Sequence, residues 1–229
     1  MNDTKNIKAK EKTLLTYLVR EPKIKTGKPP LLILMHGVGS NERDLFSLAE
    51  HLPENFLIIS ARGPFTVGSD RYAWYQVDFS TGKPMINPGQ EEKSRNTLVN
   101  FLDQLKEHYL FNEDHVYLGG FSQGAIMSYS VGLTHPEKVK GIVVLSGRLL
   151  EEVKPQAASP ERLQHLKIFI SHGRNDNVLN IQYARESLVF LKEAGLSPEY
   201  HEYNAGHGVS HEMLADLHAW LKSEESQAA

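Results

Sequence analysis

Short apolar runs alternate along this chain with segments of helical periodicity, and this alternation limits the fold more than any other feature. Leu31 to Met35 is a continuous apolar run that Gly37 ends, which is typical of a parallel strand buried on both faces. Thr13 to Arg20 alternates apolar and polar residues and predicts an antiparallel edge strand. The same criteria predict strands at 56–60, 115–119, 141–145, 167–171 and 198–203, and helices at 42–52, 91–109, 123–134, 181–194 and 210–222. We expect an α/β fold, a mostly parallel sheet flanked by helices on both faces, with a ligand site beyond the carboxyl ends of the strands.

Length and hydropathy predict one domain. The 229 residues, 40% of them hydrophobic, suit a single core, so we expect one domain over residues 1–229. Residues 1–12 and 223–229 are expected to be flexible tails. No apolar run approaches the roughly 20 residues that span a bilayer, and residues 14–19 are too short for a signal-peptide core. These features predict a cytoplasmic protein without stable membrane insertion.

Charge and cysteine content exclude several classes of function. The formal net charge is -3, so no basic field would attract nucleic acid, and we expect no nucleic-acid partner. The chain has no cysteine, which excludes disulfides, cysteine-bound zinc and a thiol nucleophile. Any nucleophile must therefore be oxygen or nitrogen.

Gly120-Phe121-Ser122-Gln123-Gly124 satisfies the G-x-S-x-G pattern between a predicted strand and a predicted helix. That context is required of a nucleophile elbow, in which the serine occupies a sharp, strained turn. The two glycines would let the helix approach the strand, and we expect Ser122 to stand exposed as the nucleophile. The alternative is a serine that caps the helix beside packing glycines.

A serine nucleophile needs a base and a group that orients the base, in the chain order Ser, Asp or Glu, His. Asp176 follows the predicted strand 167–171, and His207 follows the last predicted strand with a glycine on each side. We therefore predict His207 as general base and Asp176 as its orienting residue. The alternatives are an aspartate in an asparagine-rich turn, and His211 as the base. His211 falls in the predicted last helix, so we expect it on the surface of the first turn.

Acyl transfer also needs donors for the oxyanion. We predict the backbone N–H groups of Gln123 and of Val38, because Val38 lies in the glycine-containing turn after the strand that ends at Met35. The alternative is that the segment from His36 to Ser40 is a simple glycine turn without a role at the oxyanion. The glycine- and proline-rich loop 61–90 is expected to border the site.

Trp74, Tyr75 and Leu149 are predicted to wall a substrate pocket, because aromatic and aliphatic side chains dominate small-molecule sites. Packing that anchors the loop to the core is the alternative. Arg148 could equally be an ordinary surface charge.

Together, His36-Gly37-Val38-Gly39-Ser40, Gly120 to Gly124, His172-Gly173 with Asp176, and Gly206-His207 resemble the phospholipase/carboxylesterase family. The resemblance implies a compact α/β hydrolase without a separate cap domain. It also implies a serine carboxylesterase that hydrolyses carboxylic esters, with thioesters or lysophospholipids as further substrates, through an acyl-enzyme and without cofactor or metal. Val38-Gly39-Ser40 and the segment 146–149 differ from the acyl-protein thioesterase pattern and look closer to the bacterial carboxylesterase branch.

Two other functions are weighed against this one. A metal-dependent hydrolase could use His201, His207 and His211, but the segment lacks H-E-x-x-H and no nearby acidic residue has the spacing of a metal ligand. A hydrolase fold without catalysis could serve in binding. The expected partner is a small-molecule acyl ester, and a homodimer is left open.

Overall fold

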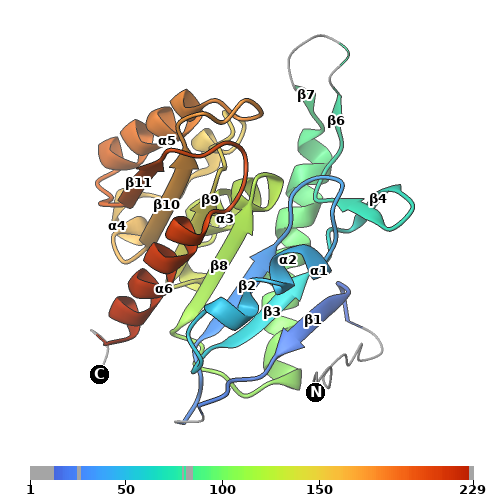
Figure 1. Ribbon diagram of the computed structural model, residues 1–229, viewed down its shortest axis with the longest axis vertical. Coiled ribbons are helices and arrows are strands. Elements are labelled where there is room, and N and C mark those ends of the chain that lie inside the picture. Colours follow the sequence, from blue (N-terminus) through green and yellow to red (C-terminus); the bar gives the residue numbers. More distant parts are fainter. Residues whose placement is uncertain (1–12, 25–26, 79, 81–84, 227–229) are drawn as a thin grey trace.

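The central element is a seven-stranded sheet that is parallel except for one edge strand (Figure 1). The computed structural model describes residues 13–24, 27–78, 80 and 85–226. In spatial order the strands are β1 (Tyr17–Arg20), β3 (Leu57–Ala61), β2 (Leu31–Met35), β8 (Val116–Phe121), β9 (Gly141–Leu145), β10 (Lys167–Gly173) and β11 (Glu199–Tyr203). Only β1 runs antiparallel to its neighbour, as its alternating pattern predicts. The expected mostly parallel α/β sheet is confirmed.

Helices cover both faces of the sheet because the inner strands are apolar on both. Within β2, Leu31, Ile33 and Met35 belong to one core cluster, and the two leucines between them belong to the other. The first cluster lies under α2 (Pro88–His108), α3 (Gln123–Thr134) and α5 (Ile181–Glu193). The second lies under α1 (Arg43–Phe46) and α6 (His211–Ser226), which Figure 1 shows on the same side.

The chain reverses its direction of travel across the sheet between β2 and β8. From β2 it moves outward to β3 and then returns past β2 to pair β8 on the other side. Ligands of open parallel sheets bind at such a switch point, beyond the carboxyl ends of the strands. The turns that follow Met35 and Phe121 meet there.

Several local predictions need correction. The predicted helix 42–52 is split into α1 and a 3-10 turn at Ala49–His51. Backbone bonds there span three residues, as from the His51 N–H to the Leu48 carbonyl and from the Leu52 N–H to the Ala49 carbonyl. Helix α6 continues to Ser226, so residues 223–226 are helical and not a tail, since Glu224 is buried against the domain. Residues 1–12 and 227–229 lie outside the described residues. Short α4 (Pro160–Leu163) and the 3-10 turns Pro136–Lys138 and Lys154–Gln156 have no predicted counterpart.

The long loop 61–90 contains two short hairpins. They are formed by β4 (Phe65–Gly68) with β5 (Arg71–Ala73), and by β6 (Val77–Asp78) with β7 (Met85–Ile86). Figure 1 shows the second hairpin extending away from the sheet, above α2. No helix among the described residues is long and apolar enough to cross a membrane.

Substitution of Gly124 tests the close packing of α3 against the end of β2. A Cβ at this position would overlap the backbone carbonyl of Met35, which cannot move without displacing β2. We expect Gly124→Ala to lower the free energy of unfolding by about 3 kcal/mol or more, measured by chemical denaturation. Gly89→Ala is the matched control, because its Cβ would make only an ordinary 3.6 Å contact at the start of α2. Its effect should stay within about 1 kcal/mol, and equal losses in both variants would contradict the argument.

Candidate active site

Ser122 lies in a strained turn between β8 and α3. Its φ of 53° and ψ of -113° fall in a region that non-glycine residues rarely adopt. Gly120 and Gly124 lie so close together that a Cβ on Gly120 would overlap the backbone of Gly124. The turn is strained as predicted. Ser122 is only 8% exposed, so the expectation that it stands exposed is wrong. The serine lies in the wall of a cavity instead.

Three side chains that are distant in sequence form one hydrogen-bonded line. His207 Nε2 lies 3.0 Å from Ser122 Oγ, and His207 Nδ1 lies 2.6 Å from Asp176 Oδ2. Each residue follows a different strand, β8, β10 and β11, at its carboxyl end. The ring of Phe121 packs against the imidazole of His207 with centroids 4.8 Å apart. The structure therefore brings together the three residues that were predicted to meet.

The carboxylate of Asp176 is fully buried and well supplied with donors. Its Oδ1 accepts the backbone N–H groups of Val178 and Leu179, both at 2.8 Å, while Oδ2 faces His207. His172 Nε2 bonds the carbonyl of Leu179 at 2.7 Å. Burial lowers the pKa of His172, which therefore stays neutral. The loop after β10 is thus fixed around a buried charge.

His36 fixes the turn after β2. Its Nδ1 donates to the carbonyl of Gly37 at 2.7 Å, and its Nε2 accepts the backbone N–H of Gly63 at 2.9 Å. Because a trans peptide is planar, the bond to the Gly37 carbonyl also directs the Val38 N–H, which points the opposite way. A Cβ on Gly37 would lie 3.5 Å from Ser122 Cβ, so this turn lies beside the serine.

Two backbone donors are free beside Ser122. Within the described part of the chain, neither the Val38 N–H nor the Gln123 N–H has a hydrogen-bond partner. Both residues line the same cavity as Ser122. The Gln123 side chain has a separate role, because its amide accepts from the Trp74 N–H at 2.8 Å and donates to the Tyr75 carbonyl at 2.7 Å.

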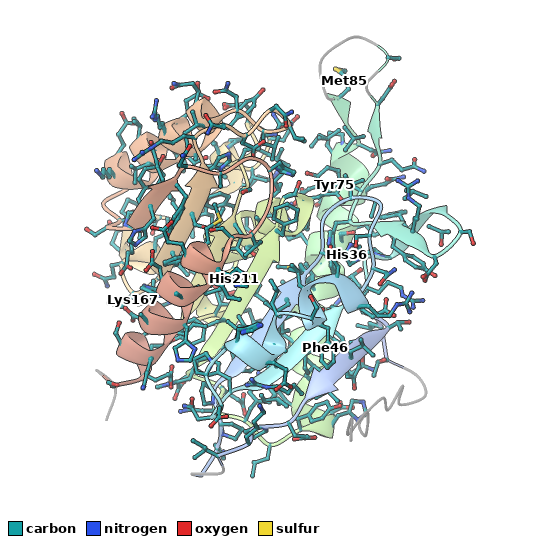
Figure 2. All side chains as sticks on the ribbon, in the orientation of Figure 1. His36, Phe46, Tyr75, Met85, Lys167 and His211 are labelled. Atoms are coloured by element: carbon teal, nitrogen blue, oxygen red, sulfur yellow. The ribbon has the colours of Figure 1, made fainter. Side chains whose placement is uncertain are left out.

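The cavity beside Ser122 has a volume of about 90 Å³. Its apolar walls come from the hairpin strands β6 and β7, from α3 and from the loop after β10: Val77, Ile86, Ile126, Val178 and Leu179. Tyr75, which precedes β6, also lines it. An open groove of about 840 Å³ adjoins it, since Val38, Val77 and Ile86 line both. Figure 2 shows Met85, which lines the groove, near the hairpin end, with Tyr75 and His36 successively closer to the sheet.

The predicted pocket residues are only partly correct. Tyr75 lines the cavity, but Trp74 and Leu149 do not. Trp74 is fully buried and donates its Nε1–H to the His36 carbonyl at 3.0 Å, so it anchors the loop. Leu149 belongs to the core cluster under α2, α3 and α5. Its neighbour Arg148, which the sequence left open as an ordinary surface charge, is half-buried and lines the cavity.

The three histidines considered as ligands of a metal-dependent hydrolase are not gathered around one site. His207 uses both ring nitrogens in the line to Ser122 and Asp176, and His201 pairs with Glu199 at 2.9 Å. His211 is exposed in the first turn of α6, as predicted. No group of three or more residues suited to hold a metal ion is found within the described ranges.

A family model of phospholipases and carboxylesterases matches residues 19–224. The chain belongs to the phospholipase/carboxylesterase family. Carboxylesterase SOBER1 of Arabidopsis thaliana is 28% identical over 204 residues, covering 83% of this chain and 89% of that protein. Acyl-protein thioesterase 1 of Emericella nidulans is 26% identical over 211 residues, covering 83% and 88%. The Bacillus cereus carboxylesterase superposes with a TM-score of 0.79 at 24% identity, over 91% of this chain and 94% of that one.

Membership of the phospholipase/carboxylesterase family confirms the resemblance seen in the sequence. It also confirms the α/β-hydrolase fold and the expected class of enzyme, one that hydrolyses ester bonds. Relatives named carboxylesterase and relatives named acyl-protein thioesterase both match. The place within the bacterial carboxylesterase branch therefore stays a prediction.

The two buried histidines predict a loss of stability in mild acid. Burial lowers the pKa of His36 and of His172 below the ordinary 6.5, so the unfolded chain binds protons before the folded chain does. The free energy of unfolding should decrease as the pH falls from about 7 to 5, by at most about 1.4 kcal/mol per unit for each histidine. The hydrogen bond from Arg185 lowers the pKa of Glu202 from its ordinary 4.5 to about 2. The stability that this carboxylate adds is therefore lost only as the pH falls below about 4.5. Urea midpoints that stay constant between pH 5 and 7 would contradict this.

Proposed function

We propose that the chain is a serine carboxylesterase that works through an acyl-enzyme, with Ser122 as nucleophile, His207 as general base and Asp176 as the residue that orients the base. The hydrogen-bonded line through these three side chains is the observation that carries the proposal. The strained turn at Ser122 supports it, because strain of this kind is found at functional sites.

In the proposed reaction, Ser122 Oγ attacks the ester carbonyl while His207 Nε2 accepts its proton. Asp176 holds the other nitrogen protonated and stabilises the imidazolium that forms. The N–H groups of Val38 and Gln123 bind the developing oxyanion, and His207 returns the proton to the leaving alcohol. Water, activated by the same imidazole, then hydrolyses the acyl-enzyme.

The cavity beside Ser122 favours a short acyl group. Its volume of about 90 Å³ is well below the roughly 300 Å³ at which sites for drug-sized ligands begin. We infer that the acyl part occupies this cavity and that the leaving group lies in the adjoining open groove. Thioesters with a short acyl part fit the same arrangement, whereas a long-chain lysophospholipid would need the groove for its acyl chain. Location in the cytoplasm and a homodimer stay predictions.

Substitution of the proposed nucleophile tests the function. Ser122→Ala should lower kcat by on the order of 10⁶-fold and abolish labelling by a fluorophosphonate, whereas Asp176→Asn should lower kcat by on the order of 10⁴-fold. The rates are measured on 4-nitrophenyl esters of two to eight carbons. Ser159→Ala, an exposed serine before α4, is the matched control and should keep full activity.

Activity retained by Ser122→Ala would overturn the serine mechanism. A folded wild-type protein that neither takes the label nor hydrolyses any ester would instead support the hydrolase fold as a binding protein. Activity that a chelator removes would favour the metal-dependent alternative.

A further inference from the structure

Arg148 stands apart from every other arginine of the chain. Each of the others bonds a carbonyl or carboxylate oxygen or forms an ion pair, but Arg148 does neither with any described residue. Its guanidinium carbon lies 5.2 Å from the centroid of the Tyr183 ring. An aromatic ring contacts the face of a guanidinium and leaves the N–H donors at its edge unused.

The position of Arg148 is built into the fold. Ser146, at the end of β9, has a φ of 50°, which is strained for a residue with a side chain. A Cβ on Gly147 would lie 2.6 Å from that of Ala125 in α3, so the turn packs tightly against that helix. On the other side, the Leu149 N–H donates to Ser187 Oγ of α5 at 3.0 Å. The backbone is therefore held on both sides of Arg148.

The cavity that Arg148 lines offers no partner for its charge. Among the residues that the structure describes, the other lining side chains are apolar apart from those of Tyr75, Ser122 and Gln123, and none is acidic. A half-buried guanidinium has lost part of its hydration, and it is stabilised when a carboxylate or another anion supplies the missing acceptors. Because the described lining residues supply no such acceptor, we infer that it arrives with a ligand or with water.

We propose that Arg148 is a specificity-determining residue that binds a carboxylate on the acyl part of the substrate. The preferred substrates are then half-esters of short dicarboxylic acids. Two observations select a carboxylate on the acyl side: the cavity is small, and it contains both Ser122 and Arg148. A guanidinium can also hold a carboxylate through two parallel hydrogen bonds. The inference rests on the proposed function for the reaction itself.

Matched esters test the preference. 4-Nitrophenyl glutarate and 4-nitrophenyl pentanoate differ in whether the acyl chain ends in a carboxylate or a methyl group. We expect wild-type kcat/KM to favour the glutarate by about tenfold or more, and Arg148→Met to remove that preference. Spontaneous hydrolysis, measured with Ser122→Ala, is subtracted. Arg162→Met is the matched control. Arg162 is an exposed arginine of α4 that pairs with Glu137, so this variant should keep the wild-type ratio.

A binding measurement separates this inference from the esterase proposal. Glutarate should raise the melting temperature of Ser122→Ala, and adding Arg148→Met should remove that shift. If the wild type hydrolyses neither ester, the proposed function fails, while the glutarate shift still decides the role of Arg148. Equal rates on both esters without a glutarate shift would overturn the inference. A preference for carboxyl-bearing alcohols, as in acetyl glycolate, or an equal shift with inorganic phosphate, would overturn the assignment to an acyl carboxylate.

Discussion

The close approach of α3 to the end of β2 is the contact on which the site depends. Gly124 lies against the Met35 carbonyl at a distance that no side chain would allow. That contact sets the serine beside the turn at Gly37, while the Ser122 N–H bonds the Leu145 carbonyl of β9 at 2.9 Å. Backbone packing therefore fixes Ser122 relative to the N–H groups of Val38 and Gln123, the proposed oxyanion donors. The strain at Ser122 is the local cost of that geometry, and the surrounding sheet sustains it.

Two buried histidines near this contact hold loops, whereas His207 lies in the line to Ser122. His36 and His172 are fully buried with lowered pKa values, and each uses its ring to hold a loop carbonyl. A charged imidazole in either place would need a buried counter-charge, whereas a neutral one needs only an acceptor for its N–H. His207 differs, because its side chain is 15% exposed and links Ser122 to a carboxylate. The rings that hold the loops are thus different from the ring that we propose to transfer the proton.

The sequence predicts the sheet and the meeting of Ser122, Asp176 and His207 better than it predicts the pocket. β2, β9 and α3 have the predicted bounds, because continuous apolar runs and glycine stops are local signals. The line from Ser122 to Asp176 was predictable because each residue directly follows a strand. Pocket walls depend instead on how the hairpins after β3 fold back, and this has no periodic signature. Trp74 and Leu149 have the composition of pocket residues but pack into the core.

Arg20 and Arg148 differ in the acceptors that surround their guanidinium groups. Arg20 is only 7% exposed and donates to four backbone carbonyl oxygens between α1 and β3, so its charge is satisfied by the protein itself. The backbone on both sides of Arg148 is also fixed, yet the Arg148 donors meet no acceptor in the described residues. A purely structural role would place acceptors around it, as around Arg20. Its place beside Ser122 is explained if the acceptor arrives with the substrate and leaves with the product.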